Sequence, residues 1–258
     1  MPPHPPPRRV VSALEEEVPF EGQDTADEQL ESAIHGLVEP TPEIIQALQE
    51  CQGKWGGIRL NMGSMRIAFL PFEVKTLVDL KILNLRNNRL TMFPAELCAA
   101  LNDLEELNLG QNLLTYLPEN LSALSNLRKL ILQDNRINIL PMGIFGLPVL
   151  QELRLDNNLL TDELPGQIAD LSVLNTLTLS NNHLRKLPTR MDELKFLTRV
   201  DLTNNPIEVC PPSITLLHQK NELLMFKSKR KGLIKRCMIL KATNASQLEL
   251  VLQEELKE

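Results

Sequence analysis

Amide side chains recur at regular spacing through the middle of this chain of 258 residues. Successive members of the series are separated by 24, 23, 23, 24 and 23 residues, and they are Asn88, Asn112, Asn135, Asn158, Asn182 and Asn205. A carboxamide both donates and accepts hydrogen bonds, and it often bonds backbone groups where a chain turns. The fixed spacing therefore predicts a structural asparagine ladder and not a catalytic constellation.

Side chains that commonly catalyse reactions or bind metals are scattered. The sequence has no G-x-S-x-G, P-loop or HExxH motif and no glycine-rich phosphate cradle. The histidines, which are His4, His35, His183 and His218, are isolated from any acidic or cysteine cluster. We therefore predict that the protein is not an enzyme, binds no small-molecule substrate, has no metal site and needs no cofactor.

Each asparagine of the ladder belongs to a longer template, L-x-x-L-x-L-x-x-N-x-L-x-x-L-P-x-x-I/L-x-x-L. Units begin at Leu80, Leu104, Leu127, Leu150, Leu174 and Leu197. A weaker unit precedes them, with Met65 where the asparagine belongs, so that seven units cover residues 57–217. The L-x-L pair places two leucines on one face of a short strand, and the proline starts the return segment. Because one unit cannot bury its own apolar face, the units must stack.

The period of the template is typical of leucine-rich repeats. The template resembles that of the intracellular leucine-rich repeat family, in the LPxxIxxL subclass of Ras-suppressor and Shoc2-like scaffolds and plant intracellular Ras-group proteins. The resemblance implies an α/β fold: a leucine-rich repeat solenoid with a curved, parallel sheet on the concave face. Two extra residues, near 98–104 and 161–164, lie outside the strands, so we expect them to leave the register of the sheet intact.

The variable strand positions define a predicted partner-binding concave face. Its residues are Lys81, Arg86, Glu105, Glu106, Arg128, Lys129, Glu152, Arg154, Asp156, Arg199 and Asp201. This face carries both signs of charge and no aromatic residue, and Arg128, Lys129 and Arg154 form a central positive cluster. Such a surface suits recognition of a folded protein by charge complementarity. The alternative is an ordinary solvated sheet face, with binding elsewhere.

The two ends differ in charge and in predicted structure. We predict that residues 1–22 form a disordered, Pro- and Glu-rich tail. We predict a helical N-terminal cap for residues 23–56; the alternative is a free acidic segment that docks to a partner. In the cap, Thr25 and Thr41 begin two helices, and Ile44, Ile45 and Leu48 should be buried. Residues 218–258 read as a helical C-terminal cap with a basic segment at 227–236.

That basic segment is a secondary basic patch of Lys227, Lys229, Arg230, Lys231, Lys235 and Arg236. It is either the solvated face of the cap or a docking patch for an acidic protein, RNA or a phosphoinositide surface. Nucleic-acid binding is the less favoured interpretation, because base stacking needs aromatic side chains and Phe226 is the one aromatic residue near this segment.

The formal net charge is −6, and no stretch approaches the roughly 18 apolar residues of a membrane span. Together with the absence of a signal peptide and of a CxxC pair, this predicts an intracellular, cytoplasmic protein, with the cytoskeleton, the cilium or the nucleus as other locations. The resemblance implies a non-catalytic scaffold or adaptor in small-GTPase or phosphatase signalling. The alternative is a structural subunit of a large assembly such as the ciliary axoneme, which docks through its termini and convex side.

Overall fold

A computed structural model describes residues 40–54 and 56–207, together with the strand residues 223–226, 229–230, 233–234 and 238–240. The predicted tail at 1–22, the predicted helix that begins at Thr25 and the predicted amphipathic helix near the C-terminus lie outside the described residues.

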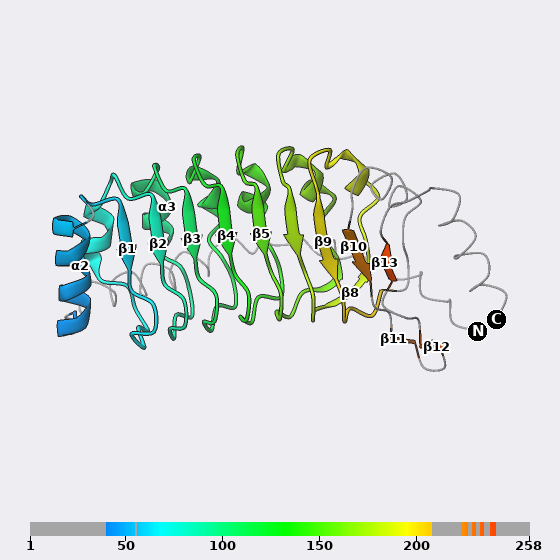
Figure 1. Cartoon of the computed structure of the whole chain (residues 1–258), viewed down its shortest axis with the longest axis horizontal. Helices are drawn as coiled ribbons and strands as arrows, with labels where there is room; N and C mark the ends of the chain where they lie inside the picture. The colour runs from blue at the N-terminus through cyan, green and yellow to red at the C-terminus, as the bar shows by residue number, and fades with distance from the viewer. Residues whose placement is uncertain are drawn as a thin grey trace, which may run out of the picture.

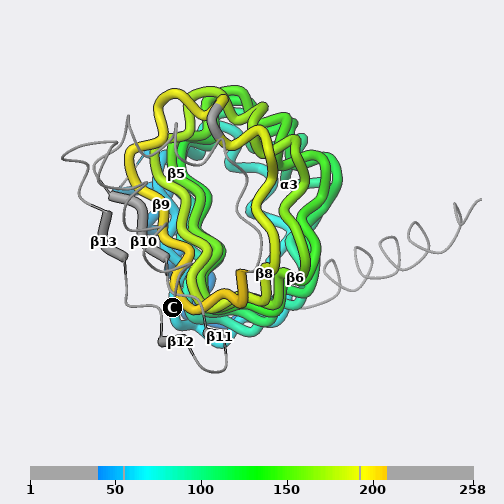
Figure 2. Tube along the Cα trace, turned by 90° about the vertical axis from the view of Figure 1, so that its right-hand side faces the viewer, coloured from blue at the N-terminus to red at the C-terminus, as the bar shows by residue number. Residues whose placement is uncertain are grey.

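One nine-stranded sheet runs along the whole described solenoid (Figure 1). Its strands, in spatial order, are β1 (Arg59–Asn61), β2 (Ile82–Asn84), β3 (Glu106–Asn108), β4 (Lys129–Ile131), β5 (Glu152–Arg154), β7 (Thr176–Thr178), β9 (Arg199–Leu202), β10 (Leu223–Phe226) and β13 (Met238–Leu240). Every neighbouring pair from β1 to β10 is parallel, and β13 alone is antiparallel to its neighbour. Figure 2 looks along the stack and shows the strands on one side of each coil and the return segments on the other.

The leucines of the template form the core between these two sides. Leu83 and Leu85 are completely buried, whereas Asn84 between them is half-buried on the solvent side of the sheet. The register aligns Leu83 with Leu60 and with Leu107, so that the same position stacks through the repeats. Each buried leucine contributes roughly 1.5–3 kcal/mol relative to an exposed one. The predicted parallel-sheet solenoid is confirmed.

Short helical turns form the return side. They are η1 (Phe72–Thr76), α3 (Ala95–Ala100), η2 (Glu119–Ala123), η3 (Met142–Gly146), η4 (Gly166–Asp170) and η5 (Met191–Glu193). The template proline precedes the first five directly, where its fixed φ fits and its missing N–H costs little.

The two extra residues are absorbed outside the main sheet, as predicted. The repeat with the first one has an α-helix instead of a 3₁₀ turn, and Leu101 N bonds Leu97 O, four residues back. The second lies in β6 (Thr161–Glu163), which pairs in parallel with β8 (His183–Lys186) and has an irregular register after Asp162. In the main sheet, β5 and β7 keep their regular pairing.

Helix α2 (Pro42–Lys54) packs against the first repeat. It begins with Pro42, as the sequence predicts, and Thr41 O accepts the first helical bond from Ile45 N at 3.0 Å. Ile44, Ala47 and Cys51 are buried and join the same core as the strand leucines. The expectation that Ile45 is buried is wrong, because this residue lies off that stripe and is 42% exposed.

The residues that the structure describes between 218 and 258 are strands, whereas the sequence predicts a helical C-terminal cap. These residues form β10, β13 and the antiparallel pair β11 (Lys229–Arg230) and β12 (Leu233–Ile234). A short apolar run such as "LLMF" does not distinguish strand from helix by its periodicity. The open edge of β9 decides the outcome, because its backbone groups need a hydrogen-bonding partner and β10 supplies one.

Cys98 makes the stability of the solenoid sensitive to alkaline pH. Burial raises the pKa of its thiol from the ordinary value of 9.0 to about 12. The unfolded chain therefore loses this proton first, so the free energy of unfolding falls as pH rises above 9. Between about pH 8 and about pH 10.5, we expect the wild type to lose about 2 kcal/mol more than Cys98→Ala, as measured by urea unfolding. Parallel pH profiles of the two proteins would contradict this expectation.

Candidate partner-binding face

Six buried asparagines fix the end of each strand to the neighbouring repeat. Asn88 Oδ1 accepts hydrogen bonds from the backbone N–H groups of Met65 and Ile67, both at 3.0 Å. Its Nδ2 donates to the carbonyl oxygens of Met62 and Leu85, both at 2.8 Å. The other five ladder asparagines each accept a bond from one backbone N–H of the preceding repeat and donate to one carbonyl oxygen of that repeat and one of their own; they are Asn112, Asn135, Asn158, Asn182 and Asn205. The asparagines thus hold neighbouring repeats together and orient the loops that follow the strands.

We call these loops the turn edge, and define it as residues 63–66, 86–89, 110–113, 133–136, 156–159 and 180–183. They lie at the lower border of the sheet in Figure 1. The residue before each ladder asparagine has a left-handed backbone, as at Asn87 (φ 57°) and Asn157 (φ 55°). Our sequence reasoning missed this role, although the Asn-Asn doublets at 87–88 and 157–158 signal it, since asparagine tolerates positive φ well.

All eleven predicted partner-binding residues lie in the sheet strands or beside them, and each is exposed or half-buried. We call this solvent side of the sheet the sheet face. The strand register brings acidic and basic residues of neighbouring repeats together, for example Glu106 opposite Lys129 and Lys129 opposite Glu152. The charges at this strand position therefore alternate across the three central repeats, from Glu106 to Glu152.

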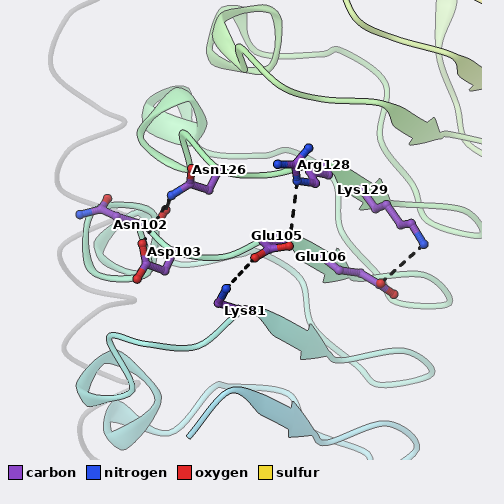
Figure 3. A network of polar contacts seen from close by, with 8 residues as sticks. All are labelled: Lys81, Asn102, Asp103, Glu105, Glu106, Asn126, Arg128 and Lys129. Carbon is purple, nitrogen blue, oxygen red and sulfur yellow. Dashed lines mark hydrogen bonds and ion pairs between the residues drawn. The ribbon is translucent and has the colours of Figure 1, made fainter.

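Ion pairs connect these alternating charges (Figure 3). Lys81 Nζ lies 3.0 Å from Glu105 Oε1, and Arg128 Nε lies 4.0 Å from Glu105 Oε2. Lys129 Nζ lies 3.8 Å from Glu106 Oε2. The hydrogen bond from Lys81 lowers the pKa of Glu105, and the same bond raises the pKa of Lys81. Both groups are exposed, so the pair orders side chains more than it stabilises the fold.

The predicted positive cluster is therefore not a free cationic patch. Arg128 and Lys129 each have a carboxylate partner, and Arg154 pairs with Glu152 in its own strand. The sequence places these residues on one surface, but it does not reveal the pairing, which depends on the register between repeats. The result is a charge-balanced mosaic on a rigid sheet.

The other predicted residues have different surroundings. Asp156 accepts hydrogen bonds from Ser180 N at 2.9 Å, from Ser180 Oγ at 2.8 Å and from Thr178 Oγ1. Asp201 accepts from Thr203 N at 3.0 Å and from its hydroxyl at 2.8 Å. These two carboxylates thus support the backbone at the turn edge in addition to facing solvent.

Arg86 and Arg199 are exposed cations that form no ion pair among the described residues. In the secondary basic patch, Lys229 and Arg230 form β11, whereas Lys227, Lys231, Lys235 and Arg236 lie outside the described residues.

The described part of the chain holds no cluster of three or more His, Cys, Asp or Glu side chains suited to a metal ion. None of its helices has both the length and the apolar character needed to cross a membrane. Its two described thiols, Cys51 and Cys98, are free and buried.

The fold and this face define a repeat solenoid that presents one long, polar sheet surface. The family model described as "Leucine rich repeat" matches residues 79–137, 125–184 and 148–207, which together cover half of the chain. The chain belongs to the leucine-rich repeat family. Proteins of this family generally act as non-catalytic scaffolds that bind other proteins.

Two solved structures with TM-scores above 0.5 share this fold. A TDR receptor shares 28% identity over 66% of this chain and 30% of that chain, with a TM-score of 0.57. A chain of the Toll–Spatzle complex of Drosophila shares 28% identity over 67% of this chain and 24% of that chain, with a TM-score of 0.55. A leucine-rich repeat protein of Leptospira interrogans shares 24% identity over 75% of this chain and 67% of that chain, with a TM-score of 0.40.

The chain spans less than a third of the matched chain in the first two structures. The comparison with curated proteins found no match.

Proposed function

We propose that this chain is a non-catalytic adaptor that binds a folded protein partner through the sheet face. The observation that carries the proposal is the ordered mosaic of ion-paired charges on Lys81, Glu105, Glu106, Arg128 and Lys129. Partly paired side chains are held in place before the partner arrives, which reduces the entropy lost on binding. A partner with the complementary order of charges is selected over one with like charges in contact.

The resemblance of the template to the LPxxIxxL subclass of intracellular repeat proteins supports small-GTPase or phosphatase signalling in the cytoplasm as the proposed setting. The proposed partner is a protein, because the sheet face presents a long row of charged and polar side chains and has no aromatic residue for stacking on small rings.

A charge exchange tests the proposal. In Glu106→Lys/Lys129→Glu the internal ion pair and the net charge are kept, but the charges that a partner meets are inverted. We expect stability to fall by no more than about 1 kcal/mol, because the glutamate at position 129 would lie opposite Glu152. We expect the amount of the partner captured from cell extract to fall at least about tenfold. Affinity capture with mass spectrometry, together with urea unfolding, measures both quantities.

The matched control exchanges the same charges on the return side, in Glu96→Lys/Lys195→Glu. Both residues are exposed there, and neither forms an ion pair among the described residues. The adaptor proposal requires that this control leaves capture intact. If both variants retain the same partners, the sheet face is not the main contact and the proposal fails.

A second candidate function is a structural subunit of a large assembly such as the axoneme. The observation that favours it is the exposed apolar side chains away from the sheet face, with Ile139 71% exposed and Phe196 62% exposed. An assembly contact on the return side would bury such residues. Loss of capture by the return-side control, with the sheet-face variant unaffected, would favour this candidate over the adaptor.

A further inference from the structure

Three cations at the turn edge of the first repeats lack the ion pairs that Lys81, Arg128, Lys129 and Arg154 form on the sheet face. Arg66, Arg86 and Arg89 are exposed, and none forms an ion pair within the described part of the chain. The turn-edge segments 63–66, 86–89 and 110–113 contain no acidic residue. This part of the turn edge is therefore a cationic surface without internal compensation.

Arg86 lies in an open, polar hollow together with Asn84, Asn87 and Gln111. Its neighbours in the stacked position are Gly63 and Gly110, which have no side chain that could pair with the guanidinium. Its Nε donates to Gln111 Oε1 at 3.1 Å. The two terminal NH₂ groups of the guanidinium have no partner among the described residues, and they have the fork geometry that matches a carboxylate.

The turn edge changes sign at the fourth and fifth repeats. Asp134 and Asp156 lie there, with Arg136 as the only basic residue of those two segments. Asp134 accepts a hydrogen bond from Asn157 Nδ2 at 2.6 Å, and Asp156 accepts from Ser180, so both carboxylates are held by neutral donors. A uniform polyanion that lies along the edge, such as a nucleic acid, would place phosphates against these carboxylates.

We infer that the turn edge binds a charge-segregated polypeptide segment of a protein partner. Its carboxylates lie over Arg66, Arg86 and Arg89, and its lysines or arginines lie over Asp134 and Asp156. This inference rests on the proposed binding role of the sheet face and names the chemistry of the partner. Parallel strands are about 4.8 Å apart, so three repeats separate the two halves by about 14 Å. An extended peptide covers that distance with about four residues.

The spacing defines the probes. One labelled peptide carries three aspartates and three lysines as two blocks separated by a single glycine, so that the block centres are four residues apart. The second peptide has the same composition with alternating charges. Fluorescence anisotropy with the full chain at low ionic strength measures both affinities. We expect the blocked peptide to bind at least about tenfold more tightly than the alternating one.

Two variants locate the contact. Arg86→Gln/Arg89→Gln should weaken binding of the blocked peptide about tenfold, because it removes the charge-assisted bonds to carboxylates. Arg185→Gln/Lys186→Gln removes the same charge from β8, outside the turn edge and the sheet face, and should change the affinity less than about twofold. Both pairs are exposed, so neither variant should unfold the protein.

Any of the following outcomes would overturn the inference. Equal affinity for the two peptides, or binding that does not change in the Arg86 and Arg89 variant, would show that the turn edge does not recognise the order of charges in a peptide. Tighter binding of a single-stranded oligonucleotide with three phosphates would make the occupant a nucleic acid. A rise in affinity on changing Glu15, Glu16 and Glu17 to glutamine would make it the acidic N-terminal segment of the chain itself. The peptide assay does not use the captured partner, so its failure with capture intact defeats this inference and leaves the adaptor proposal standing.

Discussion

Replacing Asn135 with alanine is expected to destabilise the protein by about 3 kcal/mol, because this buried side chain supplies hydrogen bonds to the backbone of two repeats. Asn135 Oδ1 accepts from Leu114 N at 3.0 Å, and its Nδ2 donates to Leu109 O at 3.0 Å and Leu132 O at 2.9 Å. After substitution, the buried N–H of Leu114 loses its partner. The two carbonyl oxygens keep one bond each, from Asn112 and Asn158.

The matched control is Asn138→Ala in the same repeat, because Asn138 is exposed and outside the ladder. We expect this control to change the free energy of unfolding by less than about 0.5 kcal/mol. Urea unfolding followed by circular dichroism measures both variants. Equal stability of the two would mean that the ladder bonds are replaced by water without cost, and that the leucine core alone holds neighbouring repeats together.

The repeat template predicts the fold well because every repeat solves the same physical problem. The L-x-L pair, the ladder asparagine and the proline each fix one local feature, and their fixed spacing stacks these features into a sheet. The same template gives the sheet positions of Lys81, Glu105 and Lys129, so the surface on which the candidate site lies could be predicted. Which charges meet could not, because ion pairing depends on side-chain conformations across the register between repeats.

The structure differs from the sequence prediction at the described residues that follow the last repeat. Residues 218–258 do not match the repeat template, so the template does not determine their secondary structure. The apolar residues of β10 fit one face of a helix as well as they fit a strand. The unpaired edge of β9 is a tertiary feature that appears only after the solenoid is built, and it favours strand addition. The turn edge is the opposite case. Its Asn-Asn doublets are a local sequence signal for the positive φ observed at Asn87 and Asn157, and this signal can be recognised without knowledge of the tertiary structure.

Contacts between return segments are a further feature that the template does not define. The second residue after the template proline is Glu73 in one repeat, Glu96 in the next and Gly143 in a later one. This variation suggests a freely substituted surface position. At Gly143, however, a Cβ atom would lie 1.9 Å from Glu119 O and 2.8 Å from the carbonyl carbon of the same residue. Both are backbone atoms of η2, so no side-chain rotation relieves the overlap.

We therefore expect Gly143→Ala to destabilise the protein by about 3 kcal/mol, with a fall in Tm of about 5–10 °C. The backbone of η2 departs from helical geometry at Asn120, next to Glu119, and Glu119 Oε2 accepts a hydrogen bond from Met142 N at 3.0 Å. These features hold η2 and η3 in close contact, so added volume must separate them. Separation would also disturb Ile144 and Leu121, which are completely buried beneath the two turns.

Gly166→Ala is the matched control, because Gly166 lies in the equivalent turn η4 and a Cβ there would meet nothing within 4 Å. We expect this variant to be neutral or to be stabilised by about 0.5 kcal/mol, since alanine reduces the freedom of the unfolded chain.

Thermal and urea unfolding of both variants decide between two descriptions of the return side. If Gly143→Ala is as stable as Gly166→Ala, the return turns adjust independently of one another and only the sheet and its ladder couple the repeats. If Gly143→Ala alone is destabilised, the return turns form a second packed layer, and the solenoid resists bending on both sides. A rigid sheet face of that kind is what a partner selected by the order of its charges requires.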